Sequence, residues 1–179
     1  MKLRGFKNAV TVGVLVPLVL MMSSCVGYFS GISIKTVEIK APVEKVFKYL
    51  EDVNNWFGFP GINGKVTKVE GQGLGQTAMT NYAFGPKQRI NSEFALVNYL
   101  PNQLLVFKAG NTGGKNDGAY TFVLTPTPDG GTRVVWVSEG SAEVPLFLAM
   151  TKWGKKKFDK EYMKYMDTFA SQLKTELEK

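Results

Sequence analysis

The chain has 179 residues, of which 44% are hydrophobic and 21% are charged, and this length and composition are typical of one globular domain rather than two. The formal net charge is +7, but the sequence has no arginine-rich block, so we expect no binding to nucleic acid. Histidine is absent and Cys25 is the one cysteine, which excludes serine–histidine and cysteine–histidine catalysis, histidine-ligated zinc and intramolecular disulfides.

The beginning of the chain has the layout of an export signal. A basic start is followed by the apolar run 9–22, and two serines then precede Cys25. This ending resembles the lipobox of bacterial lipoproteins, which implies that residues 1–25 are a signal peptide and that Cys25 is lipidated. The alternative is a membrane anchor, because residues 9–29 are 21 uncharged residues, enough to span a bilayer. Either anchor places the rest of the chain outside the cytoplasm, and a soluble exported protein is the third possibility.

The remainder predicts a short tether, residues 26–31, and one domain, residues 32–179. Alternating apolar and polar residues predict a first strand over 32–40, and helical spacing predicts a short helix after Pro42 with a second turn around Trp56. Six further segments alternate in the same way and are separated by turn residues: 64–71, 75–84, 88–100, 103–110, 119–127 and 132–143. They predict an antiparallel meander.

A long amphipathic helix closes the chain. Its apolar stripe recurs every three or four residues and consists of Phe158, Tyr162, Tyr165, Met166, Phe169, Leu173 and Leu177. Lysines crowd positions 152–160, and positive charge is unfavourable at the positive N-terminal end of a helix dipole. We therefore expect the helix to start earlier, near Glu143–Pro145, with Gly154 as a point where it can break.

Two stretches are similar to those of a known superfamily. IKAPVEKVFKYLEDVNNW resembles the first motif of the polyketide cyclase/dehydrase and START-related lipid-transport families, and KKFDKEYMKYMDTFASQLKTELEK resembles their closing helix. The resemblance covers residues 32–179 and implies the α+β helix-grip fold of the SRPBCC superfamily. In that fold a curved antiparallel seven-stranded sheet wraps around a long C-terminal helix, with a short helix pair after the first strand. Its members include lipid carriers, hormone receptors and ring-closing enzymes, so the fold does not determine the activity.

A sheet that curls around a helix encloses a space, and strand alternation indicates which side chains face it. Many of these positions are aromatic, and bulky residues that line an incompletely filled concavity form apolar pockets. We therefore expect the ligand-binding residues to be Trp56, Phe59, Tyr82, Phe84, Phe94, Phe107, Tyr120, Phe122, Trp136, Tyr162 and Met166. Plain core packing predicts the same pattern and is the alternative for each of them.

These features favour a membrane-tethered binding or carrier protein for a hydrophobic small molecule or lipid. Such a role needs no catalytic group, cofactor or metal ion, and we expect a monomer. One alternative is an enzyme of the cyclase or dehydratase type, with Tyr82, Tyr120, Tyr162, Glu93 or a buried lysine as acid or base. Another is an envelope module that binds a protein partner and whose cavity is vestigial.

Two segments each allow two interpretations. The aromatic loop around Trp56 and Phe59 is either a hydrophobic plug beneath the first helix or a functional element, namely a gate that opens the cavity or a patch that inserts into the nearby bilayer. The lysines at 152–160 are either a solvated helix face or a site of attraction to anionic lipid headgroups, which the neighbouring Met150 and Trp153 would favour.

Overall fold

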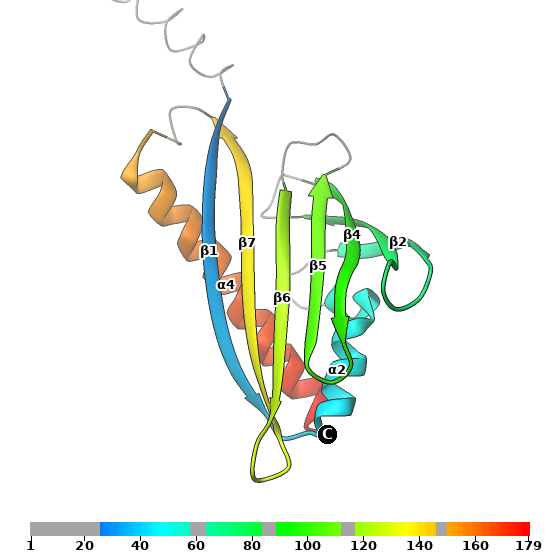
Figure 1. Ribbon diagram of the computed structural model, residues 1–179. Helices are drawn as coiled ribbons and strands as arrows, with labels where there is room; N and C mark the ends of the chain where they lie inside the picture. The colour runs from blue at the N-terminus through cyan, green and yellow to red at the C-terminus, as the bar shows by residue number, and fades with distance from the viewer. Residues whose placement is uncertain (1–25, 58–63, 84–88, 112–116, 146–149) are drawn as a thin grey trace, which may run out of the picture.

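The alternating segments form the strands of one antiparallel sheet, and the last helix packs on it (Figure 1). The computed structural model describes residues 26–57, 64–83, 89–111, 117–145 and 150–179. The elements are β1 (Val26–Ile39), α2 (Val43–Glu51), η1 (Val53–Trp56), β2 (Gly64–Glu70), β3 (Thr77–Ala83), β4 (Arg89–Leu100), β5 (Leu104–Asn111), β6 (Asp117–Pro126), β7 (Thr132–Pro145) and α4 (Lys152–Leu177). The strand order is β1-β7-β6-β5-β4-β3-β2. This is the helix-grip arrangement, so the predicted fold class is confirmed.

One face of the sheet is buried and the other faces solvent, as the alternation predicts. The buried inner positions include Phe94, Leu96, Leu105, Phe107, Phe122, Leu124, Val134 and Trp136. On the outer face, Glu93, Arg133 and Glu139 are exposed. The inner face therefore supplies one wall of the core and α4 supplies the other.

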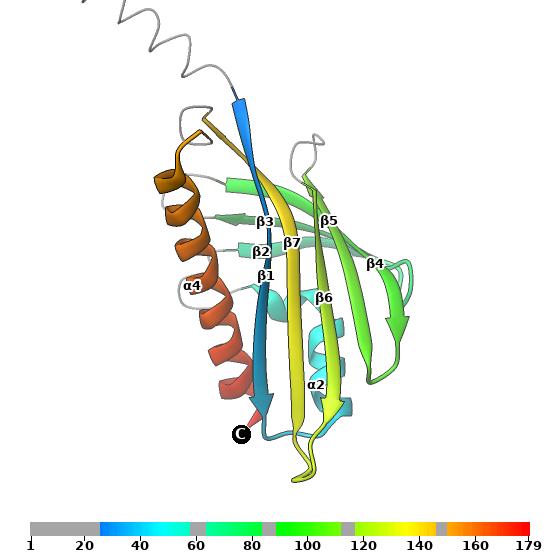
Figure 2. The same ribbon diagram turned by 60° about the vertical axis from the view of Figure 1, so that its left-hand side comes forward.

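The sheet bends because two strand pairs shift register. β4 shifts against β5 between Leu96 and Asn98, and β2 shifts against β3 between Val66 and Lys68. Such bulges bend a strand and increase its twist. As a result β2 and β3 run across the direction of β1 and β7, and the sheet curves around the inner space (Figure 2).

The short helix and the turn after it lie where the sequence predicts them. The apolar face of α2 is buried and consists of Val43, Val46, Phe47 and Leu50. The Asp52 side chain accepts hydrogen bonds from the backbone and side-chain amides of Asn54, which starts the 3₁₀ turn η1. This turn places the ring of Trp56 in the core, where it is 3% exposed.

The first strand is longer than expected. Residues 26–31, expected as a tether, belong to β1, which pairs with β7 from Val26↔Pro145 to Ile39↔Thr132. Phe29 is buried, and its ring lies 5.6 Å from that of Phe158 in α4. Pairing along the whole of β7, together with this contact, accounts for the additional strand residues.

The start of α4 differs from the prediction. Residues Glu143–Pro145 belong to β7, and α4 begins at Lys152 among the lysines. The Thr151 hydroxyl accepts a hydrogen bond from the backbone N–H of Gly154 at 3.0 Å, and such an N-cap stabilises a helix by about 1 kcal/mol. Gly154 is buried inside the helix and does not break it. The cap therefore outweighs the unfavourable position of the lysines.

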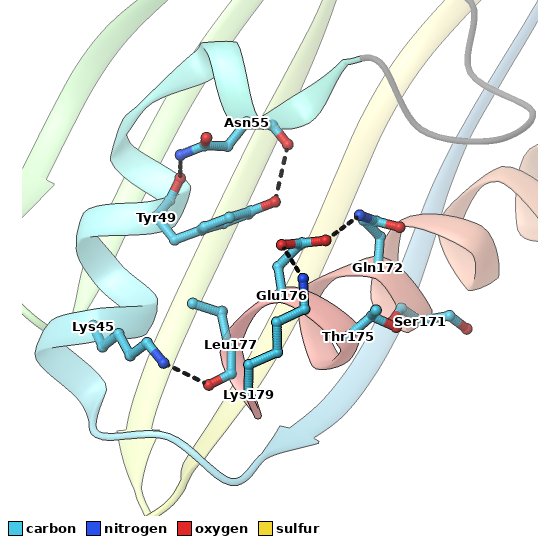
Figure 3. A network of polar contacts seen from close by, with 9 residues as sticks. All are labelled: Lys45, Tyr49, Asn55, Ser171, Gln172, Thr175, Glu176, Leu177 and Lys179. Carbon is cyan, nitrogen blue, oxygen red and sulfur yellow. Dashed lines mark hydrogen bonds and ion pairs between the residues drawn. The ribbon is translucent and has the colours of Figure 1, made fainter.

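Polar contacts fix the C-terminal end of α4 against α2 (Figure 3). The ammonium of Lys45 donates a 2.8 Å hydrogen bond to the carbonyl of Leu177, which caps the helix end. Beside this contact, burial raises the pKa of the Tyr49 hydroxyl, and the charge of Glu176 raises it further. The backbone N–H of Lys40 also donates to Glu178 at 2.9 Å. The space between sheet and helix is therefore closed at this end.

Within the described ranges, none of the helices combines the length and apolarity that crossing a bilayer requires.

Candidate functional site

An aromatic cluster fills the half of the interior that lies toward the closed end. Trp56 is at its centre, with its ring 4.6 Å from that of Phe107, 5.4 Å from Phe122 and 5.6 Å from Phe94. Each of these four side chains is at most 3% exposed. Edge-on contacts dominate, and this geometry is favourable for aromatic pairs. This half of the interior is a packed core.

Trp136 extends the cluster toward α4. Its ring stacks on Phe122 at 5.6 Å and meets Phe169 of α4 edge-on at 5.0 Å. Among the described residues its indole N–H has no hydrogen-bond partner, although it is buried. The indole N–H of Trp56, by contrast, donates to the carbonyl of Leu50 at 3.0 Å. Two equally buried tryptophans thus differ in whether their donor is satisfied.

Beyond this cluster, the inner face of the sheet becomes almost free of side chains. Four cross-strand neighbours, which we call the bare row, face inward on β1, β7, β6 and β5 in turn: Gly31, Gly140, Gly118 and Ala109. No side chain larger than a methyl group projects from these positions toward α4. Glycine inside a strand weakens it and often marks a close approach of a ligand or another backbone.

The residues next to the bare row combine apolar rings with hydroxyl groups. Tyr120 on β6 and Tyr162 and Tyr165 on α4 are half-buried, although they face the interior. The hydroxyl of Tyr162 is hydrogen-bonded to the hydroxyl of Ser138, which is 3% exposed. The ring of Tyr162 also stacks on Phe158 at 6.2 Å. The surroundings of the bare row therefore combine aromatic rings with a pair of hydroxyls.

A second concavity lies on the opposite side of the sheet. It is an open groove of about 950 Å³, bounded by outward-facing side chains and by the backbone of the bare row: Ser30, Gly31, Ile32, Glu93, Ala95, Lys108, Ala109, Gly110, Gly118, Ala119, Glu139, Gly140 and Ser141. Its floor is made of glycine, alanine and serine, and its rim carries three charged residues. None of the residues predicted to bind ligand lines this outer groove.

The fully buried polar side chains of the described interior all carry hydroxyl groups. Among the residues that the structure describes, the buried polar ones are Thr80, Ser92, Thr132 and Ser138, and none is ionisable in the ordinary pH range. Glu93, considered above as a catalytic acid or base, lies on the outer face and is exposed. Within the same ranges, no group of three potential metal ligands comes together.

The predicted site residues separate into three groups. Those in the packed core are Trp56, Phe94, Phe107, Phe122, Trp136 and Met166, the last of which is fully buried on α4. Tyr120 and Tyr162 are half-buried and pack against this core next to the bare row. Tyr82 lies in β3, but its side chain is outside the described set, and Phe59, Phe84 and Cys25 lie outside the described residues.

Sequence reasoning missed the small residues of the inner face and two hydroxyl-bearing residues near them. The bare row, Ser138 and Tyr165 were not among the predicted site residues, because small side chains do not stand out in an apolar pattern. A signal was present: Gly31, Gly118 and Gly140 each lie inside a strand, where glycine is disfavoured. The register between strands was needed to align them.

Comparisons with known proteins agree with this fold. A family model described as polyketide cyclase / dehydrase and lipid transport matches residues 34–178. No curated protein is significantly similar to the sequence. A conserved protein from Geobacillus kaustophilus has a similar structure, with a TM-score of 0.63 at 15% identity, over 82% of this chain and 95% of that one.

Two further solved structures are alike. A protein from Staphylococcus epidermidis gives a TM-score of 0.60 at 15% identity over 84% of this chain and 91% of that one. A protein from Mycobacterium smegmatis gives 0.59 at 14% identity over 82% and 90%. Likeness at such identities shows the fold alone. The family model spans most of the sequence, and the chain therefore belongs to the polyketide cyclase/dehydrase and lipid transport family.

Proposed function

We propose that this protein binds a hydrophobic small molecule or lipid between the bare row and the first half of α4. The observation that carries the proposal is the bare row itself. Four neighbouring strands present only glycine and alanine to the helix at this level, next to the half-buried Tyr120 and Tyr162. Apolar pockets of ligand carriers combine such free space with aromatic walls and few polar groups.

The walls of this space favour a ligand with a long apolar part and a small polar part. The floor is formed by the rings of Trp136, Tyr120 and Phe94, which lie within 6.3 Å of one another in successive pairs. The hydroxyls of Ser138 and Tyr162 can hydrogen-bond a carbonyl, carboxyl or hydroxyl group of the ligand. No charged side chain is buried among the described residues, which favours a ligand without a fully buried charge.

The test places a bulky side chain on either the inner or the outer face of the sheet. Ala109 faces α4 and is half-buried, so Ala109→Trp places a large ring over the bare row. Ala119 faces the outer groove, so Ala119→Trp is the matched control. Uptake of a fluorescent fatty acid and native mass spectrometry of gently purified protein measure binding. We expect Ala109→Trp to weaken uptake at least about tenfold and Ala119→Trp to change it less than about twofold.

If Ala119→Trp weakens uptake and Ala109→Trp does not, the ligand binds in the outer groove and the proposal is wrong. Full uptake by both variants would also contradict the proposal. Circular dichroism shows whether each variant is folded. Should Ala109→Trp fail to fold, Ala109→Leu gives a smaller obstruction at the same position. A co-purifying apolar compound that is lost from the folded Ala109 variant and retained by the Ala119 variant supports the inner site.

We also propose that residues 1–25 hold the domain at the outer face of a membrane, as a lipoprotein through Cys25 or as a spanning anchor. The support is the order of basic, apolar and small residues before Cys25. Cys25→Ala should release the protein from membranes if the thiol carries the lipid. Membrane retention of Cys25→Ala favours the spanning anchor, and release of the unmodified protein by salt alone contradicts both forms.

A further inference from the structure

The first turns of α4 lie at the same end of the molecule as the start of β1 (Figures 1 and 2). The contact between Phe29 and Phe158 fixes this arrangement, with ring centroids 5.6 Å apart. β1 begins at Val26, directly after the apolar N-terminal residues 1–25. Residues 1–25 therefore join the described part of the chain at the same end of the molecule as the beginning of α4.

Two large apolar side chains are exposed at this end. Met150 is 71% exposed and Trp153 is 64% exposed. The ammonium of Lys157 lies 5.3 Å from the centre of the Trp153 ring, in a cation–π contact. Tryptophan is enriched at membrane–water interfaces, where its ring meets the headgroup level and its N–H stays hydrated. An exposed tryptophan surrounded by lysines is therefore suited to such an interface.

The charge of the same segment is strongly one-sided. Positions 152–160 hold five lysines and one acid, Asp159, which pairs with Lys155 at 2.9 Å. The first turn of α4 contains no acid. Lysines four apart on a helix repel one another, and lysines near a helix N-terminus oppose the dipole. The arrangement therefore lowers the stability of the helix while it concentrates positive potential at one end of the molecule.

We propose that this end of α4 docks on an anionic phospholipid bilayer. The docking surface consists of Met150, Lys152, Trp153, Lys155, Lys156, Lys157 and Lys160. Its positive charge complements anionic headgroups, and Met150 and Trp153 insert at the interface. The inference goes beyond ligand binding and holds whether or not the inner space is occupied. Docking turns the end of the molecule opposite the α2 contacts toward the bilayer.

The experiment uses the full chain in phosphatidylcholine vesicles with or without phosphatidylglycerol, and lipids with brominated acyl chains as quenchers. Trp153 is the reporter, because Trp56 and Trp136 are each only 3% exposed. Trp153→Phe supplies their background signal. We expect strong quenching of the Trp153 signal in anionic vesicles, little in neutral ones, and recovery in salt above about 0.5 M, where the screening length is only a few ångström. Equal quenching in both vesicle types, or none in either, overturns the proposal.

A charge-removal variant tests the lysines directly. Three of them lie four residues apart on α4 and form no ion pair with another described residue, so they are replaced together: Lys152→Gln, Lys156→Gln and Lys160→Gln. A lysine near an anionic surface strengthens binding about fivefold, so we expect the docking equilibrium to weaken at least about tenfold. The melting temperature should stay the same or rise, because like-charge repulsion is relieved.

The matched control removes the same charge elsewhere on the molecule. It combines substitutions of three exposed lysines on α2, β2 and β5: Lys48→Gln, Lys65→Gln and Lys108→Gln. We expect docking of this variant to change less than about twofold, because these sites lie outside the docking surface. If both variants weaken docking equally, net charge alone is responsible and the assigned surface is wrong. Loss of ligand uptake in either variant is not expected, which separates this test from that of the inner site.

Discussion

Two buried tryptophans allow a controlled test of what a buried indole contributes to stability. Trp56 and Trp136 are both 3% exposed and both belong to the aromatic cluster. The N–H of Trp56 donates to the carbonyl of Leu50 at 3.0 Å, whereas the N–H of Trp136 has no partner among the described residues. Replacing each with phenylalanine removes similar atoms, so the two variants differ mainly in the hydrogen bond.

The magnitudes follow from packing and hydrogen bonding. Truncation of a buried aromatic residue to alanine costs about 3–5 kcal/mol, and we take about 1 kcal/mol for the smaller change to phenylalanine. Trp56→Phe also leaves a carbonyl without its donor, which adds about 1–3 kcal/mol. Trp136→Phe instead removes an unsatisfied donor, and this gain offsets the packing loss. We expect Trp56→Phe to cost about 3 kcal/mol and Trp136→Phe to stay within about 1 kcal/mol of the unmodified protein.

Urea unfolding of ligand-free protein measures the difference. With a slope of about 2 kcal/mol per molar urea, a difference of about 2 kcal/mol separates the two midpoints by about 1 M. The slope itself should be the same for both variants, because neither changes the surface that unfolding exposes. Equal midpoints, or a lower midpoint for Trp136→Phe, would refute the assignment of the stability difference to the hydrogen bond.

Two further pairs of variants test the cap at the end of α4 and the space around two glycines of the sheet. Lys45→Met removes the donor to the last carbonyl of α4 and should lower the free energy of unfolding in urea by about 1–2 kcal/mol. Lys48→Met, on the exposed side of α2, is the control and should change it by less than about 0.5 kcal/mol. Equal losses in the two variants would contradict the role of Lys45 as a helix cap. A Cβ on Gly118 would lie 2.9 Å from a backbone oxygen of β7, so Gly118→Ala should lower the melting temperature. A Cβ on Gly31 would meet only the Lys155 Nζ, at an ordinary contact distance of 3.9 Å, so Gly31→Ala should leave the temperature unchanged or raise it. A loss as large as that of Gly118→Ala would refute the steric argument.

The architecture could be predicted from the sequence because each strand carries its own pattern. Phe94, Phe107, Phe122 and Trp136 are buried at inward positions of four different strands, and the residues on either side of each are more exposed. A half-buried sheet requires this alternation, so period and face follow from the residues alone. Helical spacing after Pro42 and along α4 located both helices.

Element ends that depend on distant partners could not be predicted. Residues 26–31 extend β1 because β7 passes beside them, and no local pattern in the chain indicates that pairing. The start of α4 differs from the prediction because the hydroxyl of Thr151 caps the helix at a point where the lysines and the helix dipole disfavour a start. One N-cap at about 1 kcal/mol offsets the charge effects of a whole helix turn.

The ligand-binding residues stay a prediction, and the sequence indicates only some of the side chains at the candidate site. Sequence reasoning selects bulky apolar residues, and the structure packs most of these together around Trp56. Open space arises instead where side chains are small. Gly118 and Gly140 lie far apart in the sequence and become neighbours only through the pairing of β6 with β7. Register, which single-strand patterns do not contain, therefore determines the position of the space.

The pairing of β1 with β7 also governs the order in which the chain can fold. It joins residues 93 to 119 positions apart, from Ile39↔Thr132 to Val26↔Pro145, whereas every other strand pair joins strands that are consecutive along the chain. Contacts between residues so far apart in the sequence form slowly, because the entropy cost of closing a long loop comes before the stabilisation that the contacts give. The β2–β7 meander can assemble first, with one edge waiting for the N-terminal strand. During synthesis on the ribosome, the sheet thus stays incomplete until most of the chain, through β7, has been made.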